Sequence, residues 1–248
     1  MTRPSFFVYY YATPSIHSRQ LIIAIDGPAG SGKSTTARAV ADRLGYRYLD
    51  TGAMYRAVAF AVRRAGVRPE ASEVVAILNG LKIGLEYGSG RARVHLNGEE
   101  VTTQIRDAET GALASHVATF PEVRRALVAE QRRLAREYEA SDGGVVVDGR
   151  DIGSHVFPEA ELKVFMVADP RVRAQRRQAE MEAAGQIVSI EEVLAEIEAR
   201  DRLDESRAVA PLVQAEDALV LDSTQLTIDE QVTRVVALAR ERTNHPAV

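Results

Sequence analysis

The residue types best suited to chemistry stand together in one octet near the beginning of the chain. Residues 27–34 read Gly-Pro-Ala-Gly-Ser-Gly-Lys-Ser, which matches the phosphate-binding pattern G-x-x-x-x-G-K-[S/T] at each fixed position. Glycines let backbone N–H groups turn inward and approach phosphate oxygens closely. We therefore expect Lys33 to reach the β- and γ-phosphates of a nucleoside triphosphate and the Ser34 hydroxyl to ligate Mg²⁺.

The segments around the octet predict the elements that must position it. Residues 21–25 form a short apolar, β-branched run, typical of a buried parallel strand. Residues 34–44 place small and apolar side chains on one helical stripe. Helical and strand-like segments then alternate along the chain, which indicates an α/β fold with a mostly parallel sheet flanked by helices. Further strands are expected at 46–49, 144–148, 162–167 and 218–221.

Two segments depart from this alternation. Residues 82–102 alternate with period two and contain the hairpin signal Asn97-Gly98, so we expect a small antiparallel sheet inserted at about 80–115. Residues 170–207 contain two charged helical stretches with a break at Gly185, which we interpret as a helical lid. We expect residues 1–20 to be a disordered arm and residues 21–248 to form the core with these two additions.

Composition excludes several function classes. The chain has 248 residues, no cysteine and a formal net charge of −4, so thiol catalysis and thiolate metal sites are excluded. The negative charge indicates neither a nucleic-acid polymer nor a membrane surface as partner. No stretch approaches the about 20 apolar residues of a transmembrane helix. We expect a cytoplasmic monomer that binds small molecules.

Polar residues follow two of the expected strands. Thr51 and Arg56 come after residues 46–49, and residues 148–151 read Asp-Gly-Arg-Asp after residues 144–148. The carboxyl ends of parallel strands meet at one edge of a sheet, where ligands bind. We expect Arg56 to grip an acceptor phosphate and Asp148 to hold a water of the Mg²⁺ shell. Arg150 and Asp151 then face the acceptor.

The lid segment is rich in arginine, and we assign Arg173 and Arg177 to ATP. Such arginines would stabilise transition-state charge and help to exclude water. No carboxylate base is needed if the acceptor is a phosphate, whose oxygen is already ionised at neutral pH. The full set expected to bind ATP is Gly27, Pro28, Ala29, Gly30, Ser31, Gly32, Lys33, Ser34, Thr35, Arg173 and Arg177.

The motifs at 27–35, 49–56, 148–153 and 207–212 together resemble those of the bacterial cytidylate kinases, nucleoside monophosphate kinases of the P-loop class. The resemblance extends from about Leu21 to Arg242. It implies Mg²⁺-dependent transfer of the γ-phosphate of ATP to CMP or dCMP, giving CDP or dCDP. It also implies a core, a monophosphate-binding insertion and a short lid.

By matching position, the resemblance implies that Ser115 and Arg124 read the cytosine and that Asp204 with Arg200 holds the ribose. Lys33, Arg56, Arg150 and Arg207 are the catalytic candidates. The implied CMP-binding set is Ser31, Thr51, Arg56, Ser115, Arg124, Arg150, Asp151, Arg200, Asp204 and Arg207.

Two positions depart from the family pattern. Thr51 stands where the family often has Ser, which keeps the hydroxyl and adds a methyl group. Leu203 stands where an Arg is frequent, and the neighbouring Arg202 is the candidate substitute.

Two other readings stay open. A hydroxyl kinase of the shikimate-kinase type would carry Asp-Thr-Asp after the second strand, whereas this chain has Asp50-Thr51-Gly52. A non-kinase P-loop ATPase would carry a strand-end Asp-Glu pair, whereas Asp148 is followed by Gly149.

Overall fold

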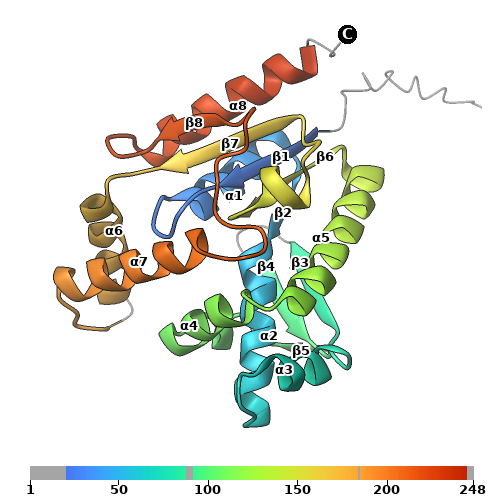
Figure 1. Cartoon of the computed structure of the whole chain (residues 1–248). Coiled ribbons are helices and arrows are strands. Elements are labelled where there is room, and N and C mark those ends of the chain that lie inside the picture. The colour runs from blue at the N-terminus through green and yellow to red at the C-terminus, as the bar shows by residue number, and fades with distance from the viewer. Residues whose placement is uncertain (1–20, 88–91, 184, 245–248) are drawn as a thin grey trace, which may run out of the picture.

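Five parallel strands form the central sheet of the structure, a computed structural model that describes residues 21–87, 92–183 and 185–244 (Figure 1). Both faces of this sheet are covered by helices, so its inner strands are almost continuously apolar. The predicted parallel α/β core is confirmed. The strand order is β2 (Arg47–Asp50), β6 (Gly144–Gly149), β1 (Leu21–Asp26), β7 (Leu162–Val167) and β8 (Leu219–Asp222).

Two pairs of helices cover the two faces of this sheet. Helices α1 (Lys33–Leu44) and α8 (Ile228–Asn244) share one apolar cluster with β1 and β7. Helices α2 (Thr51–Ala65) and α5 (Pro121–Asp142) share the other with β6. The strand ends are therefore fixed from both sides, and they carry the polar residues of interest.

A smaller antiparallel sheet packs against α2, together with α3 (Ala71–Leu78), in the lower part of Figure 1. Its strands are β3 (Ile83–Tyr87), β4 (Ala92–Leu96) and β5 (Glu99–Glu100). Asn97 and Gly98 both have positive φ, 51° and 88°, as the type I′ turn of a two-residue hairpin requires. The predicted hairpin at this turn is confirmed, whereas the expected turn at 88–90 lies outside the described residues.

The antiparallel sheet ends earlier than predicted. The expectation of sheet structure up to residue 115 is wrong, because a 3₁₀ turn (Gln104–Arg106) and helix α4 (Ala108–Val117) follow Glu100. The Asp107 carboxylate accepts a hydrogen bond from the Thr110 backbone N–H at 2.7 Å and thereby caps α4. Asp107, followed by the alanines of α4, is a sequence signal that could have indicated this helix.

Two adjacent helices form the part between β7 and β8. Helices α6 (Pro170–Ala183) and α7 (Ile190–Glu205) lie next to each other (Figure 1). They share a separate small apolar cluster. Ser189 and Glu192 form a capping box that begins α7. Gly185 lies between the two helices with φ of 80°, which agrees with the predicted break. The arm expected at 1–20 lies outside the described residues.

After β6 the chain turns through a five-residue π-helical segment, η2 (Ile152–Val156), which the sequence patterns did not predict.

Across the described residues, no helix combines the length and the apolar character needed to span a membrane.

Gly27 allows the chain to leave β1 and begin the loop, and we predict that Gly27→Ala destabilises the fold. Its φ is 152°, and an added Cβ would lie 2.2 Å from the Met166 carbonyl oxygen. We expect a loss of about 2–4 kcal/mol in the free energy of unfolding, measured by urea denaturation. Gly45→Ala is the matched control, since Gly45 has φ of 70° but no atom within 4 Å of an added Cβ, so only about 1–2 kcal/mol is expected. Equal losses in both variants would contradict the steric argument.

Candidate active site

A cavity of about 420 Å³ opens at the carboxyl ends of the parallel strands. It lies where the loop after β1, the starts of α2 and η2, and helices α4 and α7 come together. Of the residues predicted to bind a ligand or metal, those that line it are Ala29, Gly30, Gly32, Lys33, Ser34, Thr35, Thr51, Arg56, Ser115, Arg124, Asp148, Arg150, Asp151, Arg177, Arg200, Asp204 and Arg207. Segments far apart in the sequence thus contribute to one site.

Lys33 begins α1 and lies buried at the floor of this cavity. Its Nζ donates a hydrogen bond to the Pro28 carbonyl oxygen at 3.2 Å, within the same loop. Burial, together with the positive charges of Arg150 and Arg200, lowers the pKa of Lys33 to about 7. The positive charge of the ammonium group is therefore poorly compensated by negative groups around it. An anion bound in the cavity would stabilise the charged form of Lys33.

The Asp148 carboxylate lies beside the phosphate loop, at the end of β6. The Ser34 hydroxyl donates to its Oδ2 at 2.5 Å and the Tyr48 hydroxyl donates to its Oδ1 at 2.9 Å. Asp50, at the end of the neighbouring β2, stands in register with it. Burial and the charge of Asp50 raise the pKa of Asp148. Because hydroxyl and carboxylate oxygens are ligands that Mg²⁺ accepts, Ser34 and Asp148 fit the predicted metal role.

Asp204 joins Arg150 and Arg207, two of the catalytic candidates. Its Oδ2 accepts a hydrogen bond from Arg150 Nε at 2.7 Å, and its Oδ1 accepts one from Arg207. Although burial opposes it, the two guanidinium groups hold the pKa of Asp204 below its ordinary value. This carboxylate therefore stays ionised and orients both arginines at the cavity wall.

Arg124 and Asp151 form a buried ion pair at the side of the cavity that faces α4. The Arg124 guanidinium also lies 5.9 Å from the centre of the Tyr55 ring, within the range of a cation–π contact. Ser115 lines the same cavity from α4, and its hydroxyl donates to the Gly111 carbonyl oxygen of that helix at 3.4 Å. These groups form a compact polar surface next to the arginines.

Arg56 enters the cavity from α2 and is braced by backbone carbonyls. Its Nη1 donates to the carbonyl oxygens of Ile105 at 3.1 Å and Asp107 at 3.3 Å. Gly111 allows the close approach, since an added Cβ would lie 3.0 Å from a guanidinium nitrogen of Arg56. The segment leading into α4 thus holds Arg56 in place.

Sequence analysis missed two cavity arginines, Arg38 and Arg106. Arg106 Nη2 lies 3.0 Å from Asp50 Oδ2, and the Arg38 guanidinium lies 5.7 Å from the centre of the Tyr48 ring. Neither residue belongs to a motif. Arg106 is brought to the site by Asp50, 56 residues away, whereas Arg38 lies in α1 one turn after Ser34. Their charge still adds to the positive potential of the cavity.

Some expected residues lie outside the cavity lining. Gly27, Pro28 and Ser31 belong to the loop but do not line the cavity. Arg173 is buried beneath the loop, where its Nη1 donates to the Ala29 carbonyl oxygen at 3.0 Å and to Asp201 Oδ2 at 2.6 Å. Its direct contact with ATP stays a prediction. In this structure it joins the loop to α7 through these two hydrogen bonds.

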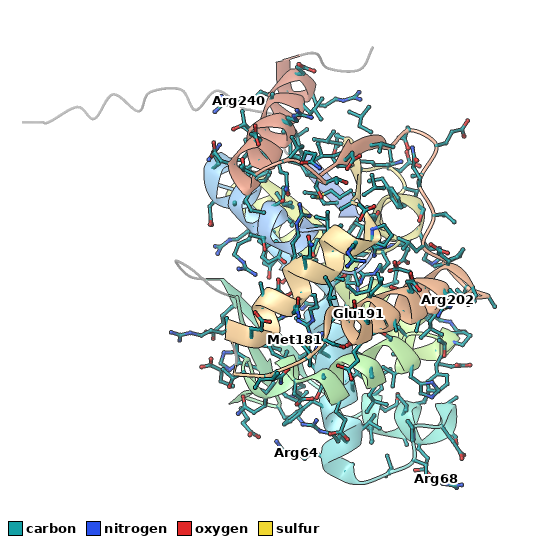
Figure 2. All side chains as sticks on the ribbon, turned by 90° about the vertical axis from the view of Figure 1, so that its left-hand side faces the viewer. Arg64, Arg68, Met181, Glu191, Arg202 and Arg240 are labelled. Carbon is teal, nitrogen blue, oxygen red and sulfur yellow. The ribbon has the colours of Figure 1, made fainter. Side chains whose placement is uncertain are left out.

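The candidate substitute Arg202 does not reach the cavity. Figure 2 shows it at the outer end of α7, where its side chain is 71% exposed and lies 3.8 Å from Glu198. Leu203, at the position where an Arg is frequent in the family, is also exposed. Arg202 therefore does not substitute in the cavity for an Arg at position 203.

Comparison with known proteins agrees with this site. The family model described as cytidylate kinase matches residues 23–241. The chain belongs to the cytidylate kinase family. A cytidylate kinase of Salinibacter ruber is 52% identical over 216 residues, which cover 87% of this chain and 95% of that protein. One of Desulfitobacterium hafniense is 45% identical over 225 residues, covering 90% of this chain and 94% of the relative. The matched region contains the whole cavity lining.

Arg200 is another poorly compensated cation of this cavity, and we predict that Arg200→Met stabilises the ligand-free protein. Within the described part of the chain it forms no ion pair, and its buried Nε has no hydrogen-bond partner. Burial and the charge of Arg150 lower its pKa to about 10. We expect a gain of about 1 kcal/mol in the free energy of unfolding. The rise in thermal midpoint caused by pyrophosphate should also become smaller.

The matched control is Arg202→Met, on the same helix but outside the cavity. It should change neither the stability nor the response to pyrophosphate. A destabilised Arg200→Met protein that responds to pyrophosphate like the wild type would contradict the prediction.

Proposed function

We propose that this protein transfers the γ-phosphate of ATP to CMP or dCMP, giving ADP and CDP or dCDP. The observation that carries the proposal is a single cationic cavity that contains both the phosphate loop and the acceptor residues implied by the family pattern. In this proposal residues of about 80–115 contribute to acceptor binding and residues of about 170–207 act as a lid. The enzyme is a cytoplasmic monomer.

The donor phosphates bind at the N-terminus of α1. Loop N–H groups and the helix dipole favour negative charge there, and Lys33 adds its ammonium group. Ser34 would hold Mg²⁺ directly and Asp148 would hold it through water, and the ion would neutralise phosphate charge. Arg177, which lines the cavity from α6, supplies a further cation on the lid side.

The acceptor binds opposite the donor phosphates. Arg56, Arg150 and Arg207 hold its phosphate, Arg200 and Asp204 hold the ribose, and Ser115 and Arg124 read the base. Asp151 fixes the Arg124 guanidinium through their ion pair. Thr51 donates its hydroxyl to the Asp148 carbonyl oxygen at 2.7 Å and thereby joins the start of α2 to the end of β6.

The reaction needs no general base. An ionised oxygen of the acceptor phosphate attacks the γ-phosphorus, and the bond to the β–γ bridging oxygen breaks, so ADP leaves with the electron pair. Catalysis then depends on holding the two phosphates in line and on stabilising the charge that develops between them. Arg150 lies close enough to Lys33 for its positive charge to lower the pKa of Lys33, so the two cations can act on the same developing charge.

The direct test is release of ADP from ATP and Mg²⁺ with CMP, dCMP, UMP, AMP or shikimate as the acceptor. Strong turnover is expected with CMP and dCMP, and little with AMP or shikimate. Turnover with shikimate would favour a hydroxyl kinase. ADP formed equally without an acceptor would favour a non-kinase ATPase and would reject the proposal.

We predict that Arg56→Ala weakens CMP binding more than ATP binding. Loss of a charge-assisted hydrogen bond to phosphate costs about 1.5–3 kcal/mol, which corresponds to roughly a tenfold or larger rise in the Kd for CMP. The Kd for ATP should change by less than about threefold, because Arg56 lies on the acceptor side. Isothermal titration calorimetry measures both constants.

Arg64→Ala is the matched control, because Arg64 lies two turns further along α2 in an exposed ion pair with Glu99. It should leave both constants unchanged. Equal weakening of CMP and ATP by Arg56→Ala would contradict the placement of Arg56.

A further inference from the structure

Asp26 is the last residue of β1 and directly precedes the phosphate loop, but no motif includes it. Its side chain is 5% exposed and does not line the cavity. Oδ1 accepts a hydrogen bond from the Ile152 backbone N–H at 2.8 Å, and Oδ2 accepts one from the Gly153 N–H at 2.7 Å. Both oxygens are thus engaged by consecutive N–H groups of another segment.

These N–H groups belong to the beginning of the π-helical turn η2. The Asp151 carbonyl oxygen accepts hydrogen bonds from His155 at 2.9 Å and Val156 at 3.0 Å, which closes the turn. The first N–H groups of a helical turn have no partner within the turn. Asp26 supplies the acceptors for two of them, so the turn is anchored to the end of β1.

The anchored turn carries the acceptor side of the site. Arg150 and Asp151 precede Ile152 directly, and both line the cavity. Gly27 follows Asp26 directly and begins the loop that binds the donor phosphates. One carboxylate therefore joins the segment that holds the donor to the segment that holds the acceptor, across the neighbouring strands β1 and β6.

The carboxylate occupies this position at an electrostatic cost. Burial raises the pKa of Asp26 to about 7, although the hydrogen bonds from Gly153 and Ile152 lower it. Within the described residues it forms no ion pair within 4 Å, and the nearby Asp151 adds repulsion. The two N–H bonds are thus its main compensation, and they fix the geometry because hydrogen bonds to a charged acceptor are short and directional.

We propose that Asp26 is a positioning residue that sets the placement of Arg150 and its bound acceptor relative to the donor phosphate loop. This role rests on the proposed phosphotransfer function. Transfer between two bound nucleotides requires both loops in register, and a displacement of about 1 Å can cost about 100-fold in rate. Hydrolysis of ATP by water needs only the donor loop.

The test compares these two reactions in Asp26→Asn. The amide oxygen can accept one N–H group, but the amide nitrogen faces the other N–H group as a second donor. We expect the kcat for transfer to CMP to fall about tenfold or more, while acceptor-free ATP hydrolysis changes by less than about twofold. The Kd values for ATP and CMP should stay within about threefold of wild type.

Val235→Ala is the control for a general loss of stability, since Val235 is fully buried in the cluster between α8 and the sheet, away from the cavity. Its ratio of transfer to hydrolysis should equal that of the wild type at a lower thermal midpoint. Asp26→Ser, which retains one acceptor oxygen, serves if the Asn variant does not fold, and the same fall in ratio is expected.

The outcomes separate the two claims. Transfer and hydrolysis that fall in parallel, or a ratio unchanged from wild type, would overturn the positioning role while CMP transfer by the wild type still upholds the proposed function. A wild-type protein that does not transfer phosphate to CMP would overturn both.

Discussion

The fold holds several cationic side chains close together at the carboxyl edge of one sheet, and their mutual repulsion governs the chemistry of the site. The charged forms of Lys33 and Arg200 are destabilised there, because burial and neighbouring arginines lower their pKa values to about 7 and about 10. In water such groups would separate, but here they are attached to α1 and α7, whose apolar faces fix their positions. A bound polyanion would reduce this repulsion, and the reduction would contribute to the binding free energy of a phosphate ligand.

Buried carboxylates pair with some of these cations and orient their guanidinium groups. Asp204 holds Arg150 and Arg207 together, and Asp151 holds Arg124. Asp148 instead accepts hydrogen bonds from the hydroxyl groups of Ser34 and Tyr48. Each pairing orients one group of donors without neutralising the cavity, which in the proposed function would let the donor, the acceptor phosphate and the base bind to different parts of it.

The sequence was sufficient for the parts of this site that follow local rules. The phosphate loop and the strand-end residues Thr51, Arg56 and Asp148 were predictable because motif spacing and the edge rule for parallel sheets are local or topological. Helix α4 was missed because the hairpin pattern before it was extended through its residues, up to about residue 115. Arg106 and Asp26 were missed because their partners, Asp50 and η2, are 56 or more residues away. Such partners emerge only when the sheet order is known.

The most direct test of this repulsion is proton uptake on binding of sulfate at pH 8 without divalent cations, because sulfate itself neither carries nor releases a proton at this pH. Lys33, with its pKa near 7, is mostly neutral at this pH, and an anion beside it raises that pKa. Calorimetry in buffers of different ionisation enthalpy should give uptake of nearly one proton, about 0.5–1 per site, and almost none in Lys33→Met. Equal heats in all buffers for the wild type would contradict the account.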